Sequence, residues 1–398
     1  MAVAALGCAL AMPLAMDIAR RFDVIDYPDG HRVNDKPTPR LGGIMLFAGI
    51  IISIGLFYLI SEHFYHRLVI LSVTPGINYY GVMLAIAVMF GVGLLDDFIN
   101  LRPLVKLLGQ IVAAGIATAS GVLLDQLLNP LGGGFIQFGL LAYPVTIFYL
   151  VAFANIINLI DGLDGLAAGI TAISAVALLV LAWSKTGLDA VVFASALIGV
   201  CVAFLFFNSH PARIFMGDSG ALMIGFMLGI ISLFGVVRTP ALISLLVPVA
   251  VAGLPVLDTL TAIIRRLRSG KSIGERDVGH IHHRFIHYGY DQRTTVLILY
   301  ALSALLAVCS VLIAQYGGGV RLVLVLGLLS LAALLVWRLG LMGSVLQHHY
   351  NKREPHLGEA GGAGRASSED VRENGNSPQT DNKDVRENDG AAHPPEDS

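Results

Sequence analysis

Charged residues are scarce in this sequence: they make up 14% of its 398 residues, whereas hydrophobic residues make up 55%. A soluble globular domain usually carries about 25% charged residues, so the composition excludes that class. The mean hydropathy of +0.73 instead indicates a multi-pass membrane protein with helical spans of about 20 apolar residues each. We therefore expect an all-α integral membrane protein.

Cysteine is also rare. The three cysteines, Cys8, Cys201 and Cys309, lie far apart in apolar segments. Their spacing matches no disulfide framework and no zinc site, so we interpret them as small hydrophobic residues. We also expect no cleavable signal peptide, because the first apolar segment lacks a basic stretch before it and leads directly into a charged loop.

Long apolar segments, by contrast, recur along most of the chain. They predict about eleven membrane spans, near 2–16, 42–60, 80–95, 105–124, 139–158, 165–183, 190–207, 220–237, 241–264, 294–314 and 320–340. The first predicted span is the shortest. We expect a transmembrane domain over residues 1–345.

Basic residues divide unevenly between the loops that join these spans. Most lie in or near the loops after the first, third, seventh and ninth spans, which stand on the same side as the loop after the fifth. The opposite loops carry only Arg67, Lys185, Arg238 and Arg321. The positive-inside rule therefore places the basic loops in the cytoplasm and the N-terminus outside.

The C-terminal segment differs from the rest of the chain in composition. From about Asn351 onward it is rich in Glu, Asp, Asn, Ser, Gly and Pro, and the sequence Asp370–Asn374 recurs as Asp384–Asn388. Such a segment cannot bury a hydrophobic core. We expect residues 346–398 to form a disordered acidic cytoplasmic tail, and we interpret the repeat as low-complexity drift in preference to a docking motif.

One cytoplasmic motif, Asn155–Gly169, stands between two apolar segments. Asn155, Asn158, Asp161 and Asp164 recur in it at every third position, and steps of three keep side chains roughly on one side of a helix. Polar groups at membrane depth are costly and usually functional. A polar loop with a helix cap would account for only one of the four, so we interpret the motif as part of a functional site.

Two further motifs carry carboxylates beside a predicted span. Asp96 and Asp97 end a span, where acids oppose the helix dipole, and this placement favours a Mg²⁺ site over solvated acids. Lys106 follows inside the next span, where a cation needs an anionic partner. In Asn208–Gly220, Asp218 opens a span among glycines, which suits phosphate or metal binding. An ordinary N-cap is compatible with that interpretation.

The remaining two motifs are basic. Asp26–Gly43 contains Arg40 and other cations that can hold phosphate, although contact with anionic lipid headgroups would explain them equally well. In Arg265–Arg284, three histidines stand among arginines that would repel zinc, so a pyrophosphate-holding loop is the better interpretation. Together, the five motifs supply carboxylates, amides and cations on one face of the membrane, a combination that suits Mg²⁺-assisted phosphoryl transfer.

These motifs, in this order, resemble those of the polyprenyl-phosphate N-acetylhexosamine-1-phosphate transferases, the glycosyltransferase 4 or WecA–TagO–MraY group. The resemblance covers roughly residues 5–340 and rests on DYPDGHRVNDKPTPRLGG, GLLDD, NIINLIDGLDGLAAG, FMGDSG and HIHHR. It implies that undecaprenyl phosphate attacks a UDP-N-acetylhexosamine, that UMP leaves, and that Mg²⁺, or alternatively Mn²⁺, is the cofactor.

Two of the motifs resemble one branch of the group more closely. Pro39–Gly43 and His280–His283 are similar to the WecA/TagO branch and differ from the branch that acts on UDP-MurNAc-pentapeptide. UDP-GlcNAc is therefore the expected donor and undecaprenyl-pyrophosphoryl-GlcNAc the expected product, as the first lipid-linked step of a cell-envelope glycopolymer. The resemblance also suggests a homodimer, and no nucleic-acid partner is expected.

The motifs and the resemblance together assign roles to individual residues. The expected catalytic residues are Asp96, Asp97 and Asp164. The expected metal ligands are Asn155, Asp97 and Asp218. The expected substrate-binding residues are Arg40, Lys106, Asn158, Asp161, Asn208, Phe215, His280, His282, His283 and Arg284.

Two other classes of protein remain as alternatives. An ion-coupled secondary transporter also uses intramembrane carboxylates, but the acids here gather at one face instead of the midplane, and no inverted repeat is visible. A scaffold that docks partners through its tail would not need the carboxylates at all.

Overall fold

The computed structural model describes most of the predicted transmembrane domain. The described residues are 1–27, 37–64, 76–128, 135–184, 187–236, 289–316 and 318–338, with the single positions 256, 261, 264 and 285. The predicted span 241–264 lies largely outside them, as do the basic motif up to Arg284 and the predicted tail 346–398.

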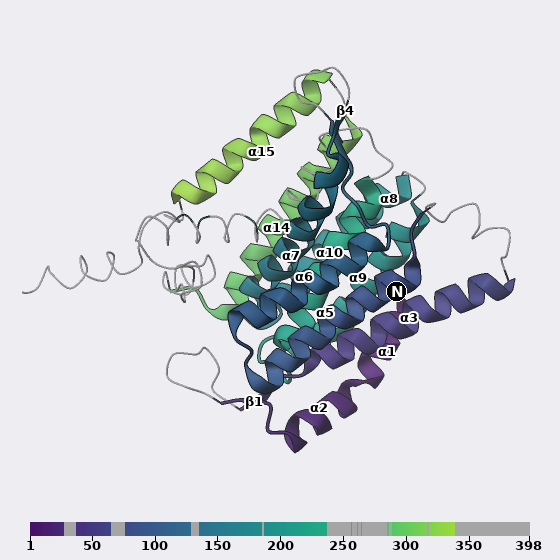
Figure 1. Cartoon of the computed structure of the whole chain (residues 1–398). Helices are drawn as coiled ribbons and strands as arrows, with labels where there is room; N and C mark the ends of the chain where they lie inside the picture. The colour runs from purple at the N-terminus through teal and green to yellow at the C-terminus, as the bar shows by residue number, and fades with distance from the viewer. Residues whose placement is uncertain are drawn as a thin grey trace, which may run out of the picture. The chain divides into compact units, whose positions relative to one another are not determined.

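Helices account for most of the described chain (Figure 1). Their bounds are α1 Ala2–Leu10, α2 Met12–Arg21, α3 Gly42–Phe64, α5 Tyr79–Ile99, α6 Pro103–Ala119, α7 Ala142–Ile160, α8 Leu166–Ser184, α9 Leu188–Asn208, α10 Gly217–Val236, α14 Gln292–Gln315 and α15 Gly318–Arg338. Within the described residues, eight helical segments are long and apolar enough to cross a membrane. The chain is a multi-pass, all-α membrane protein, as its composition predicts, and the count of eleven spans stays a prediction.

The first predicted span is longer than expected and is interrupted. It comprises α1 and α2, which together give a membrane-length segment, Ala2–Arg21, whereas the hydropathy pattern predicts an end near residue 16. Helix α2 extends beyond residue 16 and has Arg20 and Arg21 in its final turn. Cations at the C-terminal end of a helix interact favourably with the helix dipole, which explains the longer helix. The break at Ala11 precedes Pro13, which is tolerated only near the start of a helix.

Two small antiparallel ladders lie in segments that connect predicted spans. β3 (Gln126–Leu128) pairs with β4 (Phe135–Gln137) inside the segment 125–138. β1 (Ile25–Asp26) pairs with β2 (Thr38–Pro39) inside the first basic motif. The β1–β2 ladder brings the end of that motif back against the helices.

Helix α10 forms the centre of the bundle. It packs against α3, α5, α7, α8 and α9, and 94% of the residues in its apolar window are buried, the largest share among the eight segments. Further along the sequence, α14 packs on α8. The N-terminus of α10 therefore lies where the ends of several other helices meet.

The start of α10 approaches the end of α5 closely because Gly93 lies between them. A Cβ atom at Gly93 would stand 2.5 Å from the Asp218 carbonyl oxygen and 2.5 Å from the Ser219 Cα atom. Real Cβ atoms do not approach backbone so closely, so any larger residue would separate the two helices.

We predict that Gly93→Ala lowers the free energy of unfolding by about 1–3 kcal/mol, since overpacking forces backbone shifts. Gly91→Ala is the matched control: it lies in the same helix, and a Cβ atom added there would meet nothing within 4 Å. Thermal unfolding of the purified proteins in detergent provides the comparison. Equal melting temperatures for the two variants would contradict the close-approach argument.

Candidate active site

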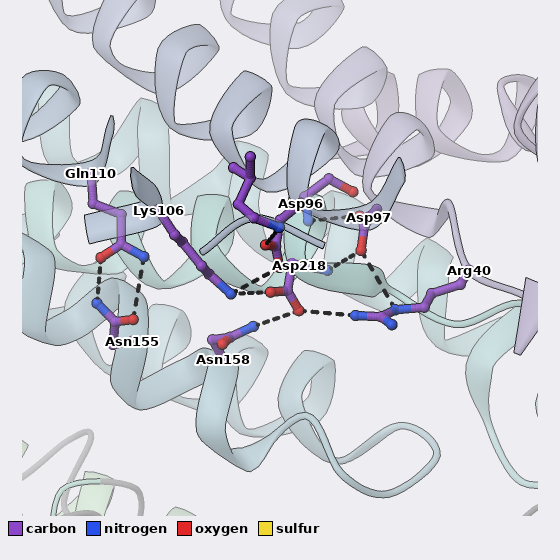
Figure 2. Close-up of polar contacts among 10 residues, drawn as sticks. Arg40, Asp96, Asp97, Lys106, Gln110, Asn155, Asn158 and Asp218 are labelled. Atoms are coloured by element: carbon purple, nitrogen blue, oxygen red, sulfur yellow. Dashed lines mark hydrogen bonds and ion pairs between the residues drawn. The ribbon is translucent and has the colours of Figure 1, made fainter. Parts of the chain in front are cut away.

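A cluster of charged and amide side chains surrounds the N-terminus of α10 (Figure 2). The ends of α5, α7 and α10, the first turns of α6 and the residue after β2 contribute to it. Its members are Arg40, Asp96, Asp97, Lys106, Asn158 and Asp218. Four of the five sequence motifs thus contribute neighbouring side chains or backbone to one end of the bundle.

Asp218 lies at the centre of this cluster. Its Oδ1 atom accepts hydrogen bonds from the Arg40 guanidinium at 3.2 Å and from the Asn158 amide at 3.1 Å. Its Oδ2 atom accepts from the Lys106 ammonium. Both carboxylate oxygens are therefore held by donors from three separate elements of the chain.

Asp97 joins α5 to α10. Its Oδ1 atom accepts from the Asp218 backbone N–H at 2.8 Å, and its Oδ2 atom accepts from the Ser219 N–H at 2.9 Å. The first N–H groups of a helix have no partner within the helix, and a carboxylate there also favours the helix dipole. Because the Asp97 side chain is fully buried and lies 3.5 Å from Arg40 Nε, its charge is compensated from both sides.

Gly217 makes this capping arrangement possible. Its φ of +71° lies in the left-handed region that favours glycine, and a Cβ atom would stand 2.6 Å from Asp97 Oδ2. A side chain at this position would collide with the carboxylate that caps the helix.

Asp96 is the second carboxylate in contact with Lys106. Its Oδ2 atom lies 3.2 Å from Lys106 Nζ, and its Oδ1 atom accepts from the Leu101 backbone N–H at 2.8 Å. Adjacent residues of one helix therefore serve different purposes: Asp97 caps α10, and Asp96 shares a cation with Asp218.

Two amides form a separate pair beside the cluster. Asn155 Nδ2 donates to Gln110 Oε1 at 2.6 Å, and Gln110 Nε2 donates to Asn155 Oδ1 at 3.3 Å. Asn155 therefore faces Gln110 and not the carboxylates (Figure 2). Gln110 was not assigned a role from the sequence, although a buried glutamine one turn beyond Lys106 in an apolar segment is itself a signal.

The other predicted catalytic carboxylate, Asp164, faces a different loop. Its Oδ2 atom lies 2.9 Å from His210 Nδ1 and accepts from the Ala212 N–H at 3.1 Å. Nearby, the Asn208 Oδ1 atom accepts from the Gly165 N–H at 2.9 Å. These contacts fasten the turn between α7 and α8 to the loop between α9 and α10.

Comparisons with known proteins identify the family of this chain. Glycosyl transferase family 4 matches residues 79–236. A "Probable undecaprenyl-phosphate N-acetylglucosaminyl 1-phosphate transferase" of Bacillus subtilis is 32% identical over 316 residues, which are 78% of this chain and 83% of the relative. The chain belongs to the polyprenyl-phosphate N-acetylhexosamine-1-phosphate transferase family.

Relatives from two further groups are of similar identity. A decaprenyl-phosphate N-acetylglucosaminephosphotransferase of Mycobacterium tuberculosis is 36% identical over 308 residues, covering 71% of this chain and 74% of the relative. A phospho-N-acetylmuramoyl-pentapeptide-transferase of Desulforamulus reducens is 35% identical over 296 residues, covering 70% of this chain and 82% of the relative. The resemblance noted from the motifs is confirmed.

In this member of the family, some residues of the polar network were not anticipated. His210 contacts Asp164, the Arg293 guanidinium donates to the His210 carbonyl oxygen at 3.2 Å, and Tyr300 donates to the Gly165 carbonyl oxygen at 2.6 Å. His210 lies within the motif Asn208–Gly220, so its polar side chain could have been expected from the sequence to join the network. Tyr300 lies in an apolar span, where sequence alone does not distinguish it from a core residue.

The other assigned residues fall into two groups. Phe215 lies in the loop before α10, where its carbonyl oxygen accepts from the Gly42 N–H at 2.8 Å and its own N–H donates to the Pro39 carbonyl oxygen at 2.8 Å. It is tied by its backbone to the residues that flank Arg40. His280, His282, His283 and Arg284 lie outside the described residues.

Asp161 differs from the other carboxylates of the site in its surroundings. It is half-buried in the turn between α7 and α8, and its side chain makes no hydrogen bond within the described part of the chain. Burial raises the pKa of Asp161 to about 7, and the nearby charge of Asp218 acts in the same direction. An added cation would favour the ionised form of this group.

The chemistry of the donors fits a hard divalent cation. Asp96, Asp161 and Asp218 offer the carboxylate oxygens that Mg²⁺ prefers, and Mg²⁺ usually binds through one or two carboxylates with several waters. Among the described residues, no three acidic, histidine or cysteine side chains already form a coordination group. In this arrangement, Lys106 and Arg40 hold the carboxylates instead.

We predict that Asp161→Asn stabilises the protein at alkaline pH. The pKa is about 7 in the folded protein against an ordinary 3.8, so the folded state holds the proton more tightly. The stabilisation from this group is complete below about pH 4 and is lost as the pH rises to about 7.

Above that pH, the asparagine variant avoids charging a buried carboxyl. Its free energy of unfolding should exceed that of the unmodified protein by about 1–3 kcal/mol at pH 8 without divalent cations, allowing for partial exposure. The gain should shrink toward pH 4, as melting curves at several pH values would show. The exposed Asp125, replaced by Asn, is the control, and a gain of equal size at pH 4 and pH 8 would refute the assignment.

Proposed function

We propose that this protein transfers GlcNAc-1-phosphate from UDP-GlcNAc to undecaprenyl phosphate. UMP leaves, and undecaprenyl-pyrophosphoryl-GlcNAc is formed as the first lipid-linked step of a cell-envelope glycopolymer. The observation that carries the proposal is the grouping of Asp96, Asp218, Lys106 and Arg40 around one point. This grouping occurs in a chain similar to relatives named for GlcNAc-1-phosphate transfer.

The charges of the cluster suit the proposed reaction. A phosphate oxygen of the lipid attacks the β-phosphorus of the donor, a new P–O bond forms, and the bond to UMP breaks. The phosphate monoester is already largely ionised near neutral pH, so Asp96 would position it and accept any remaining proton. Arg40 and Lys106 would stabilise the negative charge on the phosphoryl oxygens.

A divalent cation would neutralise charge on the pyrophosphate during transfer. Within this chain, Asp218 would hold it together with Asp96, and Asp161 lies in the adjoining turn with a carboxylate that no described donor holds. The proposed metal role of Asn155 would require it to leave Gln110, and that of Asp97 would require it to release the N-terminus of α10. We therefore assign Asp97 first to holding α10 in place.

The proposed setting is a bacterial inner membrane with the active site facing the cytoplasm. The unequal distribution of basic residues supports this orientation. The position of the cluster at the ends of α5 and α10, instead of at mid-span, argues against the ion-coupled transporter. A homodimer and a disordered acidic tail over residues 346–398 remain predictions from the sequence.

We predict that Asp218→Asn and Asp96→Asn each reduce transfer about 100-fold or more, because charge stabilisation in a water-poor site is worth that much. The assay measures UMP release from UDP-GlcNAc with undecaprenyl phosphate and Mg²⁺. Asp125→Asn is the control, and elution as a single species by size exclusion verifies folding. Full activity in either cluster variant would overturn the proposed site.

Donor choice gives a second test. We predict that UDP-GlcNAc supports transfer at a kcat/KM at least about tenfold higher than UDP-MurNAc-pentapeptide. The Desulforamulus reducens relative, 35% identical, makes the pentapeptide donor the main competitor. Release of UMP from each donor, measured side by side, decides between them, and a preference for the pentapeptide would replace the proposed substrate.

A further inference from the structure

Lys106 occupies the point where two carboxylates from different helices converge. Its Nζ atom contacts Asp96 Oδ2 from α5 and Asp218 Oδ2 from α10, while the lysine itself comes from α6. Its side chain is 18% exposed, so it is largely enclosed by protein. Like-charged carboxylates at close range repel each other unless a cation stands between them.

Arg40 does not fill the same position. It contacts the opposite oxygen of Asp218, Oδ1, and reaches back to Asp97. Arg40 therefore neutralises the capped end of α10, whereas Lys106 is the cation among the described residues that bridges Asp96 and Asp218. Three carboxylates, Asp96, Asp97 and Asp218, share these two cations, which leaves the cluster with an excess of negative charge when all are ionised.

We propose that Lys106 is a tethered place-holder for the divalent cation. With no substrate bound, its ammonium group takes the position between Asp96 and Asp218. When a divalent cation binds there, the cation and the Lys106 ammonium repel each other. The flexible four-carbon side chain then turns the ammonium toward the phosphate oxygens of the substrate. This inference rests on the proposed function, because it assumes a divalent cation at that function's site.

The place-holder role has a consequence that simple phosphate binding lacks. The apparent affinity for the metal is proportional to the fraction of molecules in which Lys106 leaves the carboxylates free. Molecules in which Lys106 holds both carboxylates therefore lower that affinity. Phosphate groups that capture the released ammonium would in turn strengthen cation binding, since coupling between two ligands is reciprocal. Removal of the Lys106 charge should therefore tighten cation binding while it weakens transfer.

The test measures Mn²⁺ binding to the purified full-length protein without substrates, by electron paramagnetic resonance. Lys106→Gln should bind Mn²⁺ about tenfold more tightly than the unmodified protein. Lys106→Arg keeps the charge and should stay within about twofold. Arg40→Gln is the charge-matched control, because it removes one positive charge beside the same carboxylate without vacating the bridging position.

A gain in affinity for Lys106→Gln well above that for Arg40→Gln supports the place-holder role. Equal affinities in Lys106→Gln and the unmodified protein overturn it. Equal gains in Lys106→Gln and Arg40→Gln also overturn it, since they would reflect only the change in net charge. Absence of UMP release from the unmodified protein would overturn the proposed function instead, so the two failures are distinguishable.

A measurement on the unmodified protein covers the case in which Lys106→Gln does not fold. The protein is treated with an amine-reactive reagent, and mass spectrometry measures the extent of labelling at Lys106. Lys383 is the internal reference. Addition of Mg²⁺ should increase the labelling of Lys106 relative to Lys383 as the ammonium leaves its carboxylates. Unchanged or decreased labelling of Lys106 would refute its displacement.

Discussion

The rest of the site depends on the contact between the Asp97 carboxylate and the first turn of α10. This contact satisfies two backbone N–H groups that a buried helix start would otherwise leave unpaired. It also sets the position of Asp218, which is one of the two residues whose N–H groups are held. Gly93 and Gly217 allow the approach, because a Cβ atom at either position would collide with the opposite partner. A capping interaction thus determines where the central carboxylate lies.

The same end of the bundle concentrates charge in a protein that has little of it. Charges removed from water are tolerated when they are paired and hydrogen-bonded, and Asp218 meets that condition through Arg40, Lys106 and Asn158. The pairing is incomplete at Asp161, whose raised pKa reflects burial without a hydrogen-bond donor among the described residues. A surplus of carboxylate suits the binding of a divalent cation and then of phosphate groups that we propose for this cluster. The membrane-spanning helices place the proposed phosphoryl-transfer site at one of their ends.

A second network holds the neighbouring turns in place. Asp164 and Asn208 use their side chains to bind the backbone of the opposite loop, and Tyr300 fastens the Gly165 carbonyl oxygen from α14. A helix more than 100 residues further along the chain thus takes part in the geometry of the turn that carries Asp161. The carboxylates of the central motif consequently divide their roles: Asp164 is committed to the loop contact, and Asp161 remains open.

The sequence by itself determined the membrane-spanning class, most of the helical segments and the polar motifs that meet at the site. Hydropathy and residue type are local properties, so they can be read without the fold. The tertiary structure alone decided the partners. It paired Asn155 with Gln110, turned Asp97 into a cap for α10, joined Asp164 to His210 and placed Lys106 between two carboxylates. Those choices depend on how helices distant in sequence pack together, and no spacing within a single motif encodes that packing.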